Sequence, residues 1–361
     1  MREKRKKEHL KIIQSLADGP GSSGFEDVHF VHNCLPGTDP ARIDMTAFFC
    51  QKKLEMPLLI NAITGGIPEA EKINRVLARV ARKLGIPMAV GSQAAALEDR
   101  KNRASYTVVR EENPDGFILA NVSCLVSPQE ACEAVEMIKA DALQVHLNAA
   151  QEMMMSKGEG DLFWHGYRQK IEQLARTLPV PILVKETGCG IAREQAWALL
   201  HTGIAALDVG GKGGANFVLV ESHRHDFGNS DAGKLFAHWG LSTVVSLVEV
   251  AEAMKKAGAR LDIVATGGIR SGLDMAKVLS LGATAAGVAA PLVRCFYRGG
   301  EEALEQYLLR LKKELWQTML LLGAHNLTEL RKKPLVILGD TAEWLRCRGV
   351  DLHHFARRGA L

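Results

Sequence analysis

Residues 262–290, DIVATGGIRSGLDMAKVLSLGATAAGVAA, decide the fold. A short apolar run (262–266) meets a glycine-rich end, a helix-length segment follows, and a second apolar run closes the stretch. Two parallel strands need a crossover of about a dozen residues or more, usually a helix, whereas an antiparallel hairpin needs only a short turn. The stretch therefore predicts two parallel strands joined by a helix.

The same pattern recurs along the chain. The apolar runs lie at 57–64, 87–92, 116–123, 142–148, 181–186, 205–211, 262–268 and 285–290. Between the first two, Ile73, Val76 and Val80 recur at helical spacing. Eight such units predict an α/β protein with a closed (β/α)8 TIM barrel in one domain. An open doubly wound sheet is the alternative, but no GxGxxG follows the first strand.

We expect one domain over 1–361. It divides into an N-terminal arm and hairpin at 1–55 (including FEDVHFVHNCLP), the barrel at 56–323, and a C-terminal tail at 324–361. The segment 217–240 is too long for an ordinary connection and predicts an extended loop after strand 6.

Composition limits the class of protein. Of 361 residues, 47% are hydrophobic and 24% charged, as in soluble globular proteins. Seven scattered cysteines without a CxxC pair favour a reducing compartment, so we expect a cytoplasmic protein. No apolar run reaches the roughly 20 residues of a membrane helix. A net charge of +4 is too small to suggest nucleic acid, and the basic start MREKRKKEHLK is either a solvated terminus or a cationic arm over an anionic ligand.

Polar residues gather where the predicted strands end, which is where barrels of this kind carry their sites. QVHLNAAQE (144–152) brings His146, Gln151 and Glu152 to the end of strand 4. Glu152 is either an ordinary residue of a helix N-terminus or a ligand of Mg²⁺, which one or two carboxylates hold together with ligand phosphates. Lys185 could form a Schiff base, pair with Glu186, or stabilise a reduced flavin.

The other strand ends suit a phosphate and a ring. Gly267, Gly268 and Arg270 in TGGIRSG, with GVAAPL after strand 8, are typical of a phosphate site, although glycines also make tight turns. Ser92 and Asn121 are hydrogen-bonding groups suited to the edge of a ring or to structural caps.

Taken together, RKKEHL, NAITGG, VGSQ, ANVS, QVHLNAAQE, VKETGCG, GGKGGANF, HWG and ATGGIRSGLDMAKVLSLGA resemble the type 2 isopentenyl diphosphate isomerases over nearly the whole chain. That resemblance implies a (β/α)8 flavoenzyme of isoprenoid biosynthesis that interconverts isopentenyl and dimethylallyl diphosphate. It also implies reduced FMN as the acid/base group, Mg²⁺ on the diphosphate and NAD(P)H as reductant. We also expect a homo-oligomer, a tetramer or octamer, because an arm that reaches a neighbour's site would favour one.

The resemblance also implies roles for individual residues. The expected catalytic residues are Gln151, Lys185 and His146. The residues expected to bind the substrate are Arg5, Lys6, His9, His146, Asn148 and Gln151, with Glu152 on the metal. The residues expected to bind FMN are Ala62, Ile63, Thr64, Ser92, Asn121, Lys185, Gly267, Gly268, Ile269, Arg270, Ala289 and Ala290.

Two positions depart from the family, and two classes of protein compete with it. Ala215 stands where relatives often have a Thr that bonds the flavin phosphate, and Ile63 replaces a common Met. An α-hydroxy-acid oxidase would need a His/Arg pair near strand 7, and the chain offers only His223 and His225 further along. A non-catalytic flavin-binding protein would need neither the basic arm nor Glu152.

Overall fold

The computed structural model describes residues 2–16, 18–155, 159–224 and 231–359. Within them, eight parallel strands close into a barrel, in which the last strand pairs with the first. Each strand lies inside one of the eight apolar runs, so the predicted fold is confirmed. In chain order these are β4 (Leu58–Ile60), β5 (Met88–Ala89), β6 (Ile118–Ser123), β7 (Ala142–Leu147), β8 (Ile182–Glu186), β9 (Ala206–Asp208), β10 (Asp262–Thr266) and β11 (Ala285–Val288).

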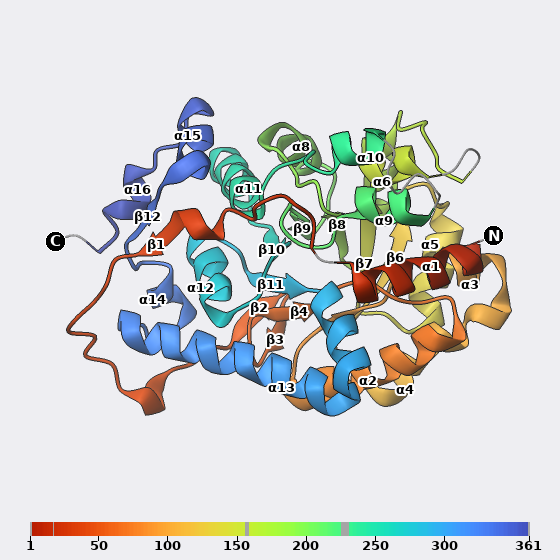
Figure 1. The fold of residues 1–361 in the computed structure, drawn as a ribbon, viewed down its shortest axis with the longest axis horizontal. Helices are drawn as coiled ribbons and strands as arrows, with labels where there is room; N and C mark the ends of the chain where they lie inside the picture. Colours follow the sequence, from red (N-terminus) through yellow and green to blue (C-terminus); the bar gives the residue numbers. More distant parts are fainter. Residues whose placement is uncertain (1, 17, 156–158, 225–230, 360–361) are drawn as a thin grey trace.

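Helices surround the barrel (Figure 1). Those in the main connections are α2 (Pro68–Leu84), α4 (Ala104–Glu112), α5 (Pro128–Met137), α7 (Tyr167–Thr177), α8 (Arg193–Leu199), α11 (Thr243–Ala257), α12 (Gly272–Leu281) and α13 (Ala290–Leu322). In α12, Ser271 and Asp274 form a reciprocal capping box that fixes where the helix begins. α13 is kinked at Gly299 and Gly300, whose backbone is not helical.

Short helices stand at the mouth of the barrel. They are α3 (Ala94–Glu98), α6 (Ala149–Met154), α9 (Phe217–Arg224) and α10 (Asp231–Phe236). The last two belong to the predicted extended loop after strand 6. Since α6 begins directly after β7, the polar residues of QVHLNAAQE turn from a strand into a helix within the mouth.

The N-terminal segment crosses the molecule. α1 (Arg2–Ser15) packs against α9 and α13 and buries Leu10 and Ile13 (Figure 1). The stretch FEDVHFVHNCLP contributes β1 (Val28–Phe30), which pairs antiparallel with β12 (Leu335–Ile337) near the C-terminus. The hairpin lies later, in β2 (Ala47–Phe49) and β3 (Lys52–Leu54).

The remaining helices, α14 (Leu327–Leu330), α15 (Gly339–Cys347) and α16 (His353–Ala356), pack at the end of the molecule that carries β12 (Figure 1). No helix in the described ranges has the length and apolar character to cross a membrane.

Candidate active site

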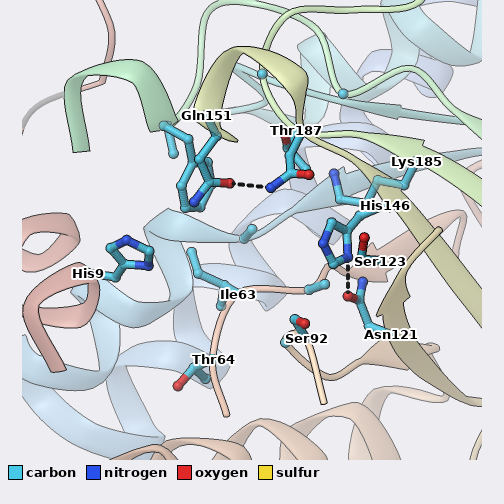
Figure 2. Close-up of a pocket in the computed structure, with 18 of the residues that line it drawn as sticks. His9, Ile63, Thr64, Ser92, Asn121, Ser123, His146, Gln151, Lys185 and Thr187 are labelled. Carbon is cyan, nitrogen blue, oxygen red and sulfur yellow. Dashed lines mark hydrogen bonds between the residues drawn. The ribbon is translucent and has the colours of Figure 1, made fainter. Parts of the chain in front are cut away.

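A cavity of about 890 Å³ opens at the carboxyl ends of the strands. All eight barrel strands contribute residues at or just beyond their ends, and α1, α6 and α9 complete the walls. The cavity brings together all the site residues predicted from sequence except Ile269, which is buried behind it. Figure 2 shows His9 across the pocket from His146 and Lys185.

His146 lies at the end of β7 with its Nδ1 2.9 Å from Asn121 Oδ1 (Figure 2). Because the Asn121 amide nitrogen donates to Gln144, its oxygen faces the ring, and Nδ1 must carry the hydrogen. Nε2 is then an acceptor. Burial, followed by the charges of Lys185, Lys6 and Arg5, lowers the pKa of His146 to about 4. The imidazole is therefore neutral at pH 7.

A buried polar chain continues from Asn121 across the barrel interior. Gln144 joins Asn121 to Asn61 through two bonds of 2.9 Å, and Asn61 donates to Asp208 at 2.6 Å. Gln144, Asn61 and Asp208 are fully buried. Buried amides and carboxylates are costly unless paired, and this chain supplies the pairs.

Lys185 stands at the end of this chain. Its Nζ lies 3.6 Å from Asp208 Oδ2 and donates to the Glu186 carbonyl at 2.8 Å. The Glu186 carboxylate instead accepts from the N–H groups of Gly188 and Gly190. Of the roles left open for Lys185, pairing with the Glu186 carboxylate is thus not found, and the amine lines the cavity beside a buried carboxylate.

Glu152 is held by its own helix and loop. Asn148 Nδ2 donates to Oε1 at 2.7 Å, and the Asp161 N–H donates to Oε2 at 2.9 Å. The described residues contain no cluster of three or more His, Cys, Asp or Glu around one point. The side chain therefore suits a metal held by one carboxylate, waters and ligand phosphates, rather than an all-protein metal site.

Two cations of the arm, Arg5 and Lys6, line the same cavity as Glu152. Lys6 Nζ donates to the Ser92 carbonyl at 2.6 Å and to the Tyr106 hydroxyl at 2.8 Å. Arg5 Nη1 lies 3.2 Å from Met155 Sδ, a weak acceptor. The basic start of the chain is thus docked over the cavity, which favours the cationic-arm interpretation over a solvated terminus.

The contacts that hold the arm involve residues that the sequence analysis missed. Glu221 of α9, fully buried, lies 2.8 Å from His9 Nε2, accepts from Gln151 at 2.7 Å and pairs with Arg224 at 2.6 Å. The His9 contact has ion-pair distance without hydrogen-bond alignment. Arg224 also pairs with Glu8 and Glu159. The sequence carried one signal for Glu221: it lies on the same face of α9 as the buried Val218. A carboxylate on a buried face needs partners.

Burial by itself raises the pKa of Glu221, but the contacts with His9, Gln151 and Arg224 outweigh it and lower the pKa to about 2. Burial also lowers the pKa of Arg224, and its three carboxylate partners reverse that effect and raise it. Both groups stay ionised. Gln151, between Glu221 and Asn148, is held with its amide at the cavity wall (Figure 2).

The glycine-rich loop after β10 fits a phosphate. Gly267 and Gly268 have φ of 121° and 77°, and a Cβ on Gly267 would stand 2.1 Å from the Gly211 carbonyl oxygen. Only glycine suits these positions. Ala289 and Ala290 bring the beginning of α13, with its partial positive charge, to the same cavity.

The combined donor set fits FMN. The glycine loop, the α13 N-terminus and Arg270 suit the phosphate, while Lys185, Asn121 and Ser92 suit the ring. Ala215 lines the cavity and brings no hydroxyl. His223 is exposed, bonds the Leu219 carbonyl and is absent from the cavity wall, and His225 lies outside the described residues.

Comparison with known proteins agrees with this geometry. A family model described as FMN-dependent dehydrogenase matches residues 116–337, which makes the chain an FMN-dependent barrel protein and confirms the predicted flavin. Among solved structures, a flavocytochrome b2 variant superposes with a TM-score of 0.68 at 17% identity, covering 95% of this chain and 85% of that one. A mandelate oxidase variant with an FMN adduct gives 0.64 at 16%, covering 91% and 95%. At such identities the likeness shows the fold alone.

Curated relatives are much closer. An isopentenyl-diphosphate delta-isomerase of Moorella thermoacetica is 47% identical, covering 96% of this chain and 97% of the relative. The enzymes of that name from Symbiobacterium thermophilum and Methanothermobacter thermautotrophicus are 42% and 40% identical, with 98% or more of each chain covered. The chain belongs to the isopentenyl-diphosphate delta-isomerase family, which confirms the resemblance seen in the sequence.

Proposed function

We propose that the protein interconverts isopentenyl and dimethylallyl diphosphate, with reduced FMN as the acid/base group and Mg²⁺ on the diphosphate. One observation carries the proposal. Arg5 and Lys6 of α1 line the same cavity as His146, Asn148, Gln151 and Glu152, and the remaining wall of that cavity fits FMN. A flavin-binding protein without this activity needs neither the arm nor Glu152.

The diphosphate end is bound by charge. Arg5, Lys6 and His9 supply the cationic and donor groups, and Glu152 would hold Mg²⁺, which would supply further positive charge for the diphosphate. Asn148 orients Glu152 through its 2.7 Å bond. Clamping this end fixes the alkene relative to the flavin, and fixed orientation lowers the entropic part of the barrier.

The hydrocarbon end of the substrate would lie against charged and neutral polar groups of the cavity wall. Reduced FMN, when bound, supplies the transferable proton and an electron-rich ring for the cationic transition state. Lys185 places a positive charge in the cavity wall that would stabilise the negative charge of a reduced flavin, and Asp208 at 3.6 Å keeps that amine in place. Gln151, held by Glu221, presents its amide to the isoprenoid carbons without an acidic proton of its own. Neutral His146 adds an acceptor at Nε2.

The arm also excludes water. Leu10 and Ile13 of α1 and Phe217 of α9 line the cavity, and the His9 ring meets Phe217 edge to face at 6.1 Å. Water admitted beside a tertiary cation would trap it as an alcohol. A closed arm therefore protects the isomerisation.

The proposal extends to the compartment, the reductant and the assembly: a cytoplasmic enzyme whose flavin is reduced by NAD(P)H, working as a homo-oligomer. A comparison of NADH with NADPH in anaerobic flavin bleaching tests the reductant. Sedimentation of the holoenzyme tests the assembly, and sedimentation as a monomer refutes that part.

The decisive experiment is anaerobic conversion of isopentenyl diphosphate by purified protein with FMN, Mg²⁺ and NADPH. Turnover only with reduced FMN and Mg²⁺ supports the isomerase. A flavin-loaded protein without turnover refutes it and sends the assay to α-hydroxy acids, the substrates of the rival class. Glu152→Gln tests the metal: we expect its Mg²⁺ requirement to weaken and its kcat/KM to fall at least 100-fold, while Glu302→Gln, at an exposed position of α13, stays near wild type.

A further inference from the structure

The segment that follows α1 packs behind the phosphate loop. The Gly19 N–H donates to the Gly214 carbonyl at 2.9 Å, and the Ser23 carbonyl accepts from Val244 at 3.0 Å. A Cβ on Gly268 would stand 2.7 Å from Ser23 Cβ. Residues 18–24, hereafter the linker, are therefore in direct contact with the loop that fits the flavin phosphate.

Asp18 makes the charged contacts of this linker. Its Oδ2 accepts from Arg270 Nε at 2.9 Å and also from Arg270 Nη2, while Oδ1 accepts from Arg294 Nη2 at 2.8 Å. Arg294 is further held by the Leu16 carbonyl at 3.2 Å. Although burial opposes it, the two arginines lower the pKa of Asp18, so the carboxylate is ionised at neutral pH.

These bonds fix how Arg270 faces the cavity. Its Nη1 donates to the Ile269 carbonyl at 2.7 Å, so Asp18 and Ile269 occupy three of the five guanidinium N–H groups. One N–H remains on each terminal nitrogen. Arg270 lines the cavity, whereas Asp18 and Arg294 do not.

We propose that Asp18 is a positioning residue for FMN: it fastens the linker to the phosphate loop and holds Arg270 in the orientation that receives the flavin phosphate. Ala215 makes this more important, because the loop after β9 brings no side-chain hydroxyl to the phosphate, whose binding then depends on backbone N–H groups and Arg270. The linker continues directly from the arm, so the substrate arm and the flavin loop are held by one piece of chain.

Losing the charge of Asp18 and losing the orientation of Arg270 predict opposite changes in the affinity for FMN, which makes the proposal testable. Asp18→Asn removes a negative charge near a dianionic phosphate, and Coulomb's law alone predicts tighter FMN binding. Loss of the orientation of Arg270 predicts weaker binding. We expect orientation to dominate and the FMN Kd of the apoprotein, titrated by quenching of flavin fluorescence, to rise about tenfold, a change of about 1.4 kcal/mol.

Riboflavin, which lacks the phosphate, separates positioning from general damage. We expect Asp18→Asn to change its Kd less than twofold, and the control Asp115→Asn, at an exposed residue before β6, to change neither Kd. An FMN Kd that is unchanged or lower overturns the proposal. An equal rise in the Kd of FMN and in the Kd of riboflavin also overturns it.

Arg294→Gln provides a second route in case Asp18→Asn lowers the melting temperature of the apoprotein. This variant removes the partner of Oδ1 but leaves Arg270 and the cavity wall in place. We expect the FMN Kd to rise about threefold with riboflavin unaffected, and no change would count against the proposal. Neither experiment uses the diphosphate substrate, so failure here is distinguishable from failure of the isomerase assay.

Discussion

Replacing Glu221 by Gln tests how the arm is held. The change keeps the shape of the side chain and removes its charge from among His9, Gln151 and Arg224. The shift of its pKa from the ordinary 4.5 to about 2 corresponds to about 3 kcal/mol of stabilisation at neutral pH. Breaking a buried charge pair typically costs about 3–5 kcal/mol, and Arg224 keeps Glu8 and Glu159 as partners, so the lower end applies.

The direction of the pKa shift of Glu221 determines how its stabilisation of the fold depends on pH. The carboxyl has a lowered pKa in the folded protein, so its contribution is complete above the ordinary value of 4.5 and is lost as the pH falls toward about 2. We therefore expect the free energy of unfolding of Glu221→Gln to lie about 3 kcal/mol below wild type from pH 7 to pH 5. The difference should shrink progressively below pH 4.5.

Urea unfolding at several pH values measures this difference, with Glu302→Gln as the control for the loss of one carboxylate. Trypsin cleavage within α1, where Lys4 and Lys7 are exposed, reports whether the arm undocks before the barrel unfolds. If Glu221→Gln and Glu302→Gln unfold alike, or if the difference does not change with pH, the assignment of Glu221 as the buried anchor of the arm is wrong.

The other predictions concern single groups. The imidazole resonances of His146 should titrate near pH 4 rather than 6.5 in NMR spectra, and a midpoint near 6.5 would contradict its burial beside three cations. Lys6→Gln should raise KM for the diphosphate substrate about 10- to 100-fold with a smaller change in kcat, because a charge-assisted contact contributes about 1.5–3 kcal/mol; an unchanged KM would remove Lys6 from the diphosphate site. Leu59→Ala, in a fully buried position of β4, should lower the free energy of unfolding by about 2–5 kcal/mol in urea titrations, and a loss below 1 kcal/mol would mean that the core is loosely packed there.

The barrel was predictable because its evidence is local. Runs such as ILVKE and DIVAT are apolar on both faces and return at intervals that hold one helix each, so strand order and the position of the mouth follow from spacing. The pairing of β1 with β12 was not predictable, since the two strands lie about 300 residues apart and neither carries a signal for its partner.

The residues of the candidate site were likewise predictable from the sequence only in part. The place of His146, Lys185 and Glu152 at the mouth of the barrel was predictable because polar residues at a strand end are conspicuous in the sequence, and all three line the cavity. Asp18 and Glu221 were missed because what makes them informative is a partner 252 or 212 residues away. Ile269 was assigned to the flavin from its place in the loop, whereas its side chain is buried behind the cavity and only its neighbours line the wall.

The polar chain inside the barrel shows what the chemistry requires of the fold. Val, Ile and Leu at the positions of Asn61, Gln144 and Asp208 would fill the barrel interior without the free-energy cost of burying polar groups. Each buried polar group, in contrast, must find a partner. Here every link is made, from His146 through Asn121 and onward to Lys185. The result is an imidazole with a fixed tautomer and an amine with a fixed position, both lining the cavity. Local departures from an apolar core concentrate at functional sites. This buried series of polar side chains ends in His146 and Lys185, the two groups whose positions the proposed reaction requires to be fixed.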